Sequence, residues 1–210
     1  HIVLSDRIKN YVISNFNISE KKVFKINPGV STEKKPNYCK KADIKFKFFS
    51  SSRFVKEKGL DMYIKAANLL NNRYPDKFEF YISGNGEEYN NLIELNKTLG
   101  NCVIFVDYLK DFHSVWLNAK VFVFTSLSDS EGVPAIILQA IQAGCLVISS
   151  SYNGYEDIFP KELSNMIFEK EKLERLIEKI EFVYKNYDEL IKNSTHYYEP
   201  ILKKYSVKDM

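Results

Sequence analysis

From about residue 44 onward, short apolar runs alternate with segments whose apolar residues recur at helical spacing. Between Gly59 and Tyr74, for example, Leu60, Ile64 and Ala67 fall on one face of a helix. The apolar runs predict β-strands over residues 44–52, 78–84, 102–106, 120–126, 145–151 and 165–169. The periodic segments predict helices over residues 59–74, 87–100, 111–119, 134–144, 169–186 and 188–205, two of them stopped by Gly100 and Gly144.

This alternation predicts the class of the fold. Strands that are apolar on both faces must be buried on both faces, as in a parallel sheet that helices cover on each side. We therefore expect an α/β fold with a Rossmann-like, doubly wound parallel sheet of about six strands. Ligands bind such sheets at the carboxyl ends of the strands, so the loops that follow the strands are where a site is expected.

The loop that precedes Pro134 carries the strongest local signal. Gly132 lets a ligand approach the backbone, and proline suits the first turn of a helix because its missing N–H is not needed there. The free amides of residues 135–137 would face the cleft with the positive end of the helix dipole behind them, which predicts an anion site. Glu131 would repel a phosphate at that spot, so we expect it to accept hydrogen bonds from hydroxyl groups, such as those of an adjacent sugar. The alternative is a carboxylate that only stabilises the helix dipole.

Two cations follow the first strand of the predicted sheet. Arg53 and Lys58 lie five residues apart and can reach one point above the sheet edge, where a diphosphate would accept a guanidinium and an ammonium group. A solvated turn with surface charges is the alternative. The next loop contains Gly84 and Gly86, but Tyr89 stands where a dinucleotide fingerprint needs a third glycine, which disfavours a Rossmann dehydrogenase.

Composition and charge exclude several classes of partner and of site. The net charge of +3 arises without a basic block, so we expect no nucleic-acid partner. Cys39, Cys102 and Cys145 are too few and too scattered for a disulfide framework or a zinc site, and they favour buried thiols in a reducing compartment. No stretch approaches the roughly 18 to 20 apolar residues of a membrane span. We therefore expect a cytoplasmic protein with at most a peripheral contact at the inner face of the membrane.

Four segments carry a resemblance to a known family through their order and spacing. They are "NPGVS" (27–31), "SSRFVKEKGLDMYIKA" (51–66), "YISGNGEEYNNL" (81–92) and "TSLSDSEGVPAIILQAIQAGCLVISSSYNGYEDI" (125–158). Together they resemble the donor-binding half of the family 4 glycosyltransferases, which are retaining enzymes with the GT-B fold. The resemblance implies that the predicted sheet is the C-terminal half of a GT-B fold. It also implies a nucleotide-diphosphate sugar as donor substrate, carrying UDP or GDP, and neither cofactor nor metal in the site.

The resemblance also implies roles for individual residues. Arg53 and Lys58 match the cation pair that neutralises the departing diphosphate, and Glu131 matches the first carboxylate of the E-x7-E motif, which faces the transferred sugar. Gln139 stands where the family usually has a second glutamate that holds the ribose, and its amide keeps an acceptor oxygen. Asp107 stands where the family often has a glycine near the base. The donor-binding residues implied in this way are Ser52, Gly84, Asp107, Tyr108, Ser130, Gly132, Val133, Pro134, Ala135 and Gln139.

The expected domain organisation follows from the same comparison. Residues 1–30 open within a helix and match the end of an N-terminal half and the crossover from it, residues 31–187 form the donor-binding domain, and residues 188–210 form a closing helix. The acceptor, a glycan or a lipid-linked sugar in cell-surface polysaccharide synthesis, would bind mainly to the N-terminal half. We therefore expect this fragment alone to be inactive.

Two other functions fit part of the pattern. A GT-B-like epimerase acting on a sugar nucleotide would share the anion site but would need its own acid and base groups. His113, expected on a helix face, and His196, expected on the surface, do not lie in the loops of the predicted site. A non-catalytic module that binds nucleotide sugars is the other alternative, for which Gln139 is the hint.

Overall fold

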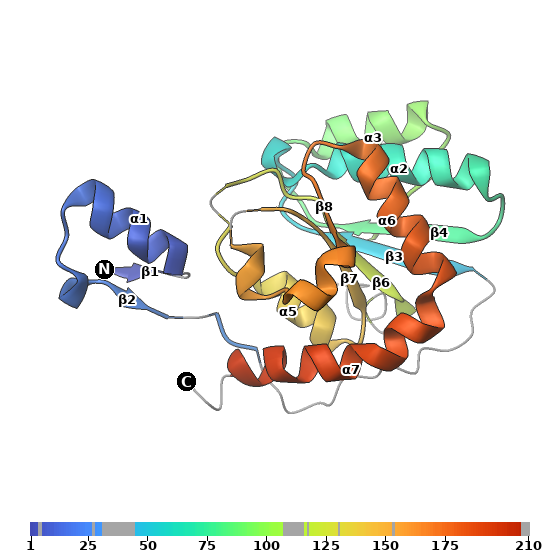
Figure 1. Ribbon diagram of the computed structural model, residues 1–210. Helices are drawn as coiled ribbons and strands as arrows, with labels where there is room; N and C mark the ends of the chain where they lie inside the picture. The colour runs from blue at the N-terminus through green and yellow to red at the C-terminus, as the bar shows by residue number, and fades with distance from the viewer. Residues whose placement is uncertain are drawn as a thin grey trace.

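The computed structural model contains the predicted alternation of strands and helices (Figure 1). It describes residues 1–3, 6–26, 28–30, 45–106, 116, 118–129, 131–152 and 154–206. The lysine-rich segment 31–43 and most of the helix predicted over 111–119 lie outside these residues.

Six strands form one parallel sheet with the order β5-β4-β3-β6-β7-β8. From β3 the chain proceeds outward to β5, and from β6 it proceeds outward to β8 on the other side, so β3 and β6 adjoin where the order reverses. This arrangement confirms the predicted doubly wound α/β fold. The strands are β3 (Phe46–Ser51), β4 (Phe78–Ser83), β5 (Ile104–Val106), β6 (Val121–Phe124), β7 (Leu146–Ser150) and β8 (Ile167–Phe168).

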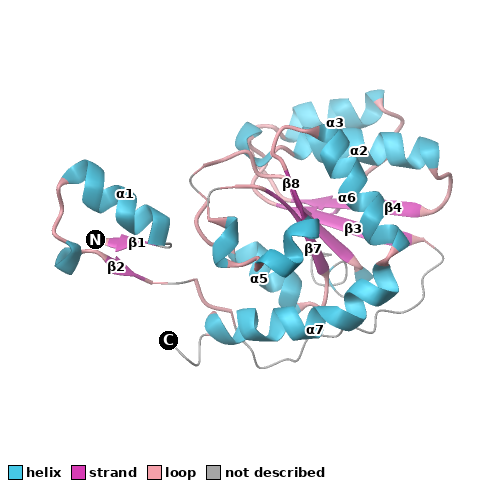
Figure 2. Ribbon diagram, viewed as in Figure 1, coloured by secondary structure: helices cyan, strands magenta, loops and turns pink. Residues whose placement is uncertain are grey.

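Helices cover the sheet on both sides (Figures 1 and 2). α2 and α3 pack together on one side, α5 and α7 lie on the other, and α6 packs against α2 and β8. As predicted, α3 ends shortly before Gly100 and α5 shortly before Gly144. The helices are α2 (Leu60–Arg73), α3 (Tyr89–Thr98), α5 (Ala135–Gln142), α6 (Leu173–Lys185) and α7 (Tyr187–Lys204).

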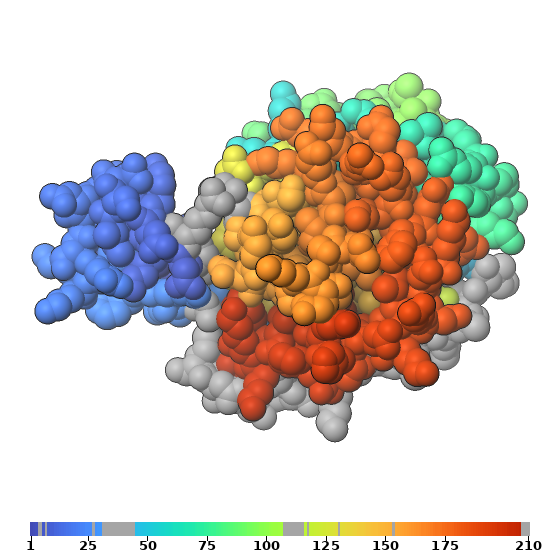
Figure 3. Space-filling model, in the orientation of Figure 1, coloured from blue at the N-terminus to red at the C-terminus, as the bar shows by residue number. Residues whose placement is uncertain are grey.

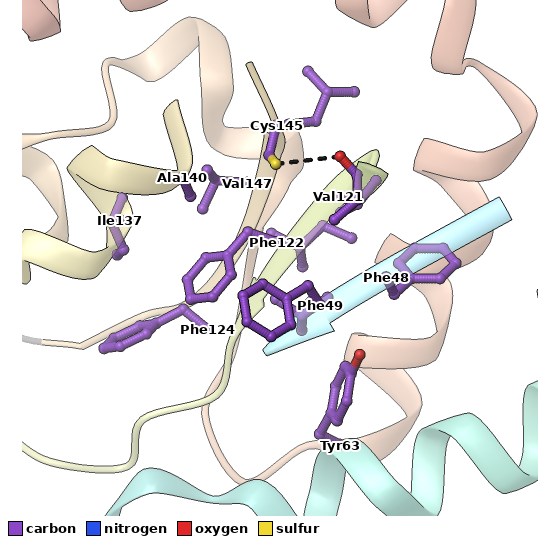
Figure 4. Packing of buried hydrophobic residues seen from close by; sticks show 14 of the residues in the cluster. Phe48, Phe49, Tyr63, Val121, Phe122, Phe124, Ile137, Ala140, Cys145 and Val147 are labelled. Carbon is purple, nitrogen blue, oxygen red and sulfur yellow. Dashed lines mark hydrogen bonds between the residues drawn. The ribbon is translucent and has the colours of Figure 1, made fainter. Parts of the chain in front are cut away.

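Aromatic side chains from the central strands fill the core (Figure 4). Phe49 of β3 and Phe122 of β6 lie with their ring centroids 6.1 Å apart, and both are fully buried. Cys145 is also buried and its thiol donates to the carbonyl of Ala119 at 3.3 Å. Cys102 is half-buried, and burial raises the pKa of its thiol.

The opening of the chain contains the expected helix, but its first residues form a strand before that helix begins. A short strand, β1 (Ile2–Val3), precedes α1 (Asp6–Phe16) and pairs in parallel with β2 (Phe24–Lys25). These elements form a strand–helix–strand unit beside the main body of the molecule (Figure 3). A two-residue strand is too short to show an alternating pattern, which is why the sequence did not predict it.

The end of the chain after α7 binds the segment that follows the N-terminal unit, and α7 itself contacts the sheet. Val30, which follows that unit, donates its amide to the carbonyl of Tyr205 at 2.9 Å and forms a parallel bridge with Ser206. On the sheet side, the hydroxyl of Tyr198 accepts the amide of Val147 in β7 at 3.1 Å. Within the described part of the chain, no helix combines the length and the apolar character that crossing a membrane requires.

Two buried tyrosines make the stability of the fold sensitive to alkaline pH. Burial raises the pKa of Tyr63 well above its ordinary value of 10.0, and burial together with the Glu131 carboxylate raises the pKa of Tyr152. The unfolded chain releases these protons near pH 10, while the folded protein retains them. The stability that each tyrosine contributes is therefore complete below about pH 10 and falls above it by about 1.4 kcal/mol per pH unit.

We therefore expect the free energy of unfolding, measured with urea between about pH 8 and about pH 11, to fall steeply above about pH 10. The fall should be less steep in a Tyr152→Phe variant, which has one fewer buried phenol to titrate. A slope that this variant leaves unchanged would contradict the assignment.

Candidate active site at the carboxyl ends of the strands

One cavity lies over the carboxyl ends of β5, β4, β3 and β6, and so includes the place where β3 and β6 adjoin. Its volume is about 940 Å³, at the upper end of the range for small-molecule sites. The described residues that line it are Ser51, Ser52, Arg53, Phe54, Lys58, Gly84, Asn85, Tyr89, Phe105, Val106, Phe124, Glu131, Pro134 and Ile136. Six of the residues predicted from the sequence are among them: Ser52, Arg53, Lys58, Gly84, Glu131 and Pro134.

The loops that follow β3 and β4 are joined by backbone hydrogen bonds. The amide of Phe54 donates to the carbonyl of Asn85 at 2.8 Å, and the amide of Glu88 donates to the carbonyl of Phe54 at 2.9 Å. These bonds continue the pairing of β3 with β4 beyond the ends of the strands. They fix the backbone directly after Arg53, and this side of the cavity is therefore preformed.

Lys58 and Glu131 form an ion pair within the cavity. Nζ of Lys58 lies 2.5 Å from Oε1 of Glu131, and the side chains are only 16% and 9% exposed. The hydroxyl of Ser126 donates to the same carboxylate oxygen. The sequence predicted both charged residues for the site but not their pairing, because they are 73 positions apart in the chain.

The backbone that carries Lys58 is held by the loop after β6. Lys58 ends a 3-10 turn, η2 (Lys56–Lys58), and its carbonyl accepts the hydroxyl of Thr125 at 2.8 Å. One residue earlier, the carbonyl of Glu57 accepts the amide of Leu127 at 2.7 Å. The two loops that supply the ion pair are thereby held against each other.

Arg53 lies at the same cavity but is exposed, and it forms no ion pair with any residue that the structure describes. The two cations predicted for one site therefore line the same cavity but differ in burial and in ion pairing. Lys58 is paired and mostly buried, whereas the guanidinium of Arg53 is available to an anion from solution.

The start of α5 supplies fewer free amides than the sequence predicted. The amide of Ile137 donates to the carbonyl of Pro134 at 3.1 Å, because the first turn of the helix is tight. The prediction of three free amides at residues 135–137 is thus wrong for the last of them. The amides of Ala135 and Ile136 have no hydrogen-bond acceptor among the described residues, and Ile136 lines the cavity.

The remaining predicted residues lie elsewhere or are not described. Gly132 and Val133 are buried and do not line the cavity. Ala135 and Gln139 are exposed, and neither is among the described residues that line the cavity, so the expected ribose contact of Gln139 stays a prediction. Asp107, Tyr108 and Ser130 lie outside the described residues, as does His113, while His196 is exposed as expected.

An aromatic wall on the β5 side of the cavity was not predicted. The rings of Phe54 and Tyr89 are stacked with their centroids 5.9 Å apart, and Phe105 contacts both rings edge-on. Phe54 is buried, whereas Tyr89 is 43% exposed. Phe105 could have been recognised from its place near the end of a strand. In the sequence, Tyr89 stands out only as the residue that interrupts a glycine motif.

Comparisons with known proteins find two bacterial glycosyltransferases that are similar in sequence. The UDP-Gal:α-D-GlcNAc-diphosphoundecaprenol α-1,3-galactosyltransferase of Escherichia coli is 27% identical over 191 residues, which are 84% of this chain and 49% of that protein. The GalNAc-α-(1→4)-GalNAc-α-(1→3)-diNAcBac-PP-undecaprenol α-1,4-N-acetyl-D-galactosaminyltransferase of Campylobacter jejuni is 26% identical over 123 residues, 58% of this chain and 34% of that protein. The chain therefore spans half or less of the length of these relatives.

A solved structure shows which part of the fold is present. The S. aureus TarM structure, a mutant in complex with fondaparinux, α-GlcNAc-glycerol and UDP, matches with a TM-score of 0.84 at 20% identity. The match covers 99% of this chain and 41% of TarM, so the chain has the fold of the C-terminal half of a GT-B glycosyltransferase. The sequence profile of the family "Glycosyl transferases group 1" matches residues 31–197. This match covers well over half of the chain, and the chain therefore belongs to the group 1 glycosyl transferases, the family 4 enzymes that its motifs resemble.

Proposed function

We propose that this chain is the donor-binding half of a retaining glycosyltransferase, and that its cavity binds a nucleoside diphosphate sugar. The observation that carries the proposal is the convergence of Arg53, Lys58, Glu131 and the start of α5 on one cavity at the reversal point of the sheet. In this kind of sheet that position is where ligands bind. The combination of two cations with one carboxylate suits a ligand that has a diphosphate next to hydroxyl groups.

The cations and the helix start would act on the diphosphate. When the bond between the sugar and the diphosphate breaks, negative charge develops on the leaving oxygen. The exposed guanidinium of Arg53, the ammonium of Lys58 and the amide of Ile136 would stabilise this charge from positions fixed beforehand. Glu131 would accept hydrogen bonds from hydroxyls of the transferred sugar.

The aromatic wall would accommodate the nucleobase. One side of the Tyr89 ring is covered by Phe54, while the residue keeps 43% of its surface exposed. A planar base has a π-face that can stack on such a ring, and this end of the cavity is otherwise lined by Phe105 and Val106. Uridine is the first candidate, because TarM was solved with UDP and the E. coli relative is named for UDP-Gal.

The acceptor would bind outside this chain, in the other half of the whole enzyme. Both bacterial relatives are named for undecaprenol-linked acceptors. We propose a lipid-linked sugar or a growing glycan as the acceptor here too, within cell-surface polysaccharide synthesis. Such an acceptor would bring a cytoplasmic enzyme into peripheral contact with the inner face of the membrane.

A panel of nucleotide sugars tests this function. We expect UDP-sugars or GDP-sugars, at about 100 times their Kd, to stabilise the domain by about 2.7 kcal/mol, which raises its melting temperature by roughly 5–10 °C. The whole protein should then transfer the sugar to a lipid-linked acceptor with retention, while the isolated chain transfers little or nothing. Binding without transfer by the whole protein would favour a non-catalytic module, and conversion of the sugar nucleotide without an acceptor would favour an epimerase. The absence of any binding would refute the proposal.

A further inference from the structure

The loop after β6 holds the site carboxylate through a residue that is not part of the proposed donor contacts. Ser126 is 1% exposed, and its hydroxyl donates to Oε1 of Glu131, the oxygen that also accepts Nζ of Lys58. Two donors therefore converge on one oxygen of the carboxylate. No hydrogen bond between described residues engages Oε2, so this second oxygen is the one left for a ligand in the cavity.

Ser126 is itself firmly anchored. Its carbonyl accepts the hydroxyl of Ser150, at the end of β7, at 2.6 Å, and its own Oγ accepts the amide of Ser128 at 3.3 Å. Its neighbour Thr125 holds the backbone of Lys58. Ser126 is thus connected both to the sheet and to the charged pair. Its hydroxyl also lies 3.3 Å from the carbonyl of Glu57, but the carboxylate of Glu131 is the closer acceptor.

The two donors on Glu131 differ in what a ligand does to them. A diphosphate in the cavity competes for the ammonium of Lys58, because a doubly charged anion is a stronger partner than one carboxylate. The hydroxyl of Ser126 is buried and uncharged, so the diphosphate does not draw it away. After the donor has bound, Ser126 is the partner that keeps Glu131 in place.

We propose that Ser126 is a positioning residue, which holds the Glu131 carboxylate toward the sugar while Lys58 turns to the diphosphate. The inference rests on the proposed function, since it requires a donor with both a diphosphate and a sugar. If the hydroxyl only stabilised this loop, its loss would instead lower the stability of the fold and weaken the binding of the donor and of UDP to the same extent.

Three variants of Ser126 in the whole protein test the proposal. In Ser126→Ala we expect kcat to fall about 10- to 100-fold, because small misplacements of a reacting group have effects of this size. The KM for the donor and the Kd for UDP, which lacks the sugar, should change by no more than about threefold, because Lys58 and Arg53 remain. Ser126→Thr and Ser126→Val add nearly the same volume and differ only in the hydroxyl. We expect the threonine variant to retain a kcat at least about tenfold above that of the valine variant.

Ser149→Ala serves as the matched control. Ser149 is buried at the end of β7 and donates to the carbonyl of Ser150, away from the charged pair, so its loss should leave kcat unchanged. Equal kcat values for the threonine and valine variants, or a loss of UDP affinity that parallels the loss of kcat, would overturn the positioning role. Absence of transfer by the unmodified protein with every nucleotide sugar would instead remove the proposed function, and this inference with it.

Discussion

Replacing Lys58 with alanine is expected to reduce sugar transfer by the whole protein about 100- to 1000-fold, the usual cost of removing one preorganised donor that stabilises developing charge. Lys58 is suited to this role because its ammonium lies inside the cavity and its backbone is held by Thr125. Steady-state transfer rates at saturating donor and acceptor measure the effect. Near-normal activity would refute the assignment of Lys58 to the leaving diphosphate.

The same substitution should also lower stability, because Glu131 keeps only the hydroxyl of Ser126 as a partner. Leaving a carboxylate that is 9% exposed without its cation costs on the order of 2–3 kcal/mol, or roughly 4–12 °C in melting temperature for a chain of this size. The double variant Lys58→Met/Glu131→Gln removes both charges and should recover most of this stability while remaining inactive. Recovery of stability without recovery of transfer separates the chemical role of Lys58 from its part in the fold.

Lys65→Ala is the matched control for the loss of a lysine. Lys65 lies on α2 and pairs with Asp61 one helical turn away, with both side chains about half exposed. Exposed pairs of this kind contribute about 0.3–0.5 kcal/mol. We therefore expect both transfer and stability to remain close to those of the unmodified protein.

The sequence predicted the sheet because its strands are short and apolar and alternate with segments of helical periodicity, two of which end at a glycine. The same reasoning located the loops that carry Arg53, Lys58 and Glu131, since the carboxyl ends of parallel strands must lie at one edge. It could not predict the pairing of Lys58 with Glu131. That contact depends on how two loops pack against each other, and local periodicity carries no information about it.

Three further features of the site depended on geometry that spacing does not determine. Gln139 follows Glu131 at the interval typical of the family, yet it lies exposed and outside the set of described cavity residues. Ile137 was expected to present a free amide, but the tight first turn of α5 directs that amide to Pro134. The stacking of Tyr89 on Phe54 brings together the first residue of α3 and a residue of the loop after β3, and neither position alone indicates the contact.

Replacing Gly84 with alanine is expected to have the largest effect on stability of any single change at the site. Gly84 has a φ of +148°, which side chains other than hydrogen rarely tolerate. A Cβ at this position would lie 1.9 Å from the carbonyl oxygen of Ser52 and 2.6 Å from Cε1 of Phe54. The ring could shift, but the carbonyl belongs to the backbone that leads into Arg53. We expect a loss of about 3 kcal/mol or more in the free energy of unfolding, together with weaker donor binding because the loop after β3 must move.

Gly100→Ala is the control for a glycine that has a positive φ but no steric clash. Gly100 also has a positive φ, +78°, but a Cβ there would meet no atom within 4 Å. Its replacement should therefore cost only about 1 kcal/mol, and it should leave donor binding unchanged because Gly100 lies beyond α3, outside the residues that line the cavity. Urea unfolding and titration with UDP, applied to both variants, measure the two effects side by side. A loss of only about 1 kcal/mol in Gly84→Ala as well would show that the contact with the carbonyl of Ser52 does not exclude a side chain at position 84. A larger loss in Gly84→Ala, accompanied by weaker UDP binding, would show that the close approach of two backbone segments shapes the cavity and that the cavity binds the nucleotide.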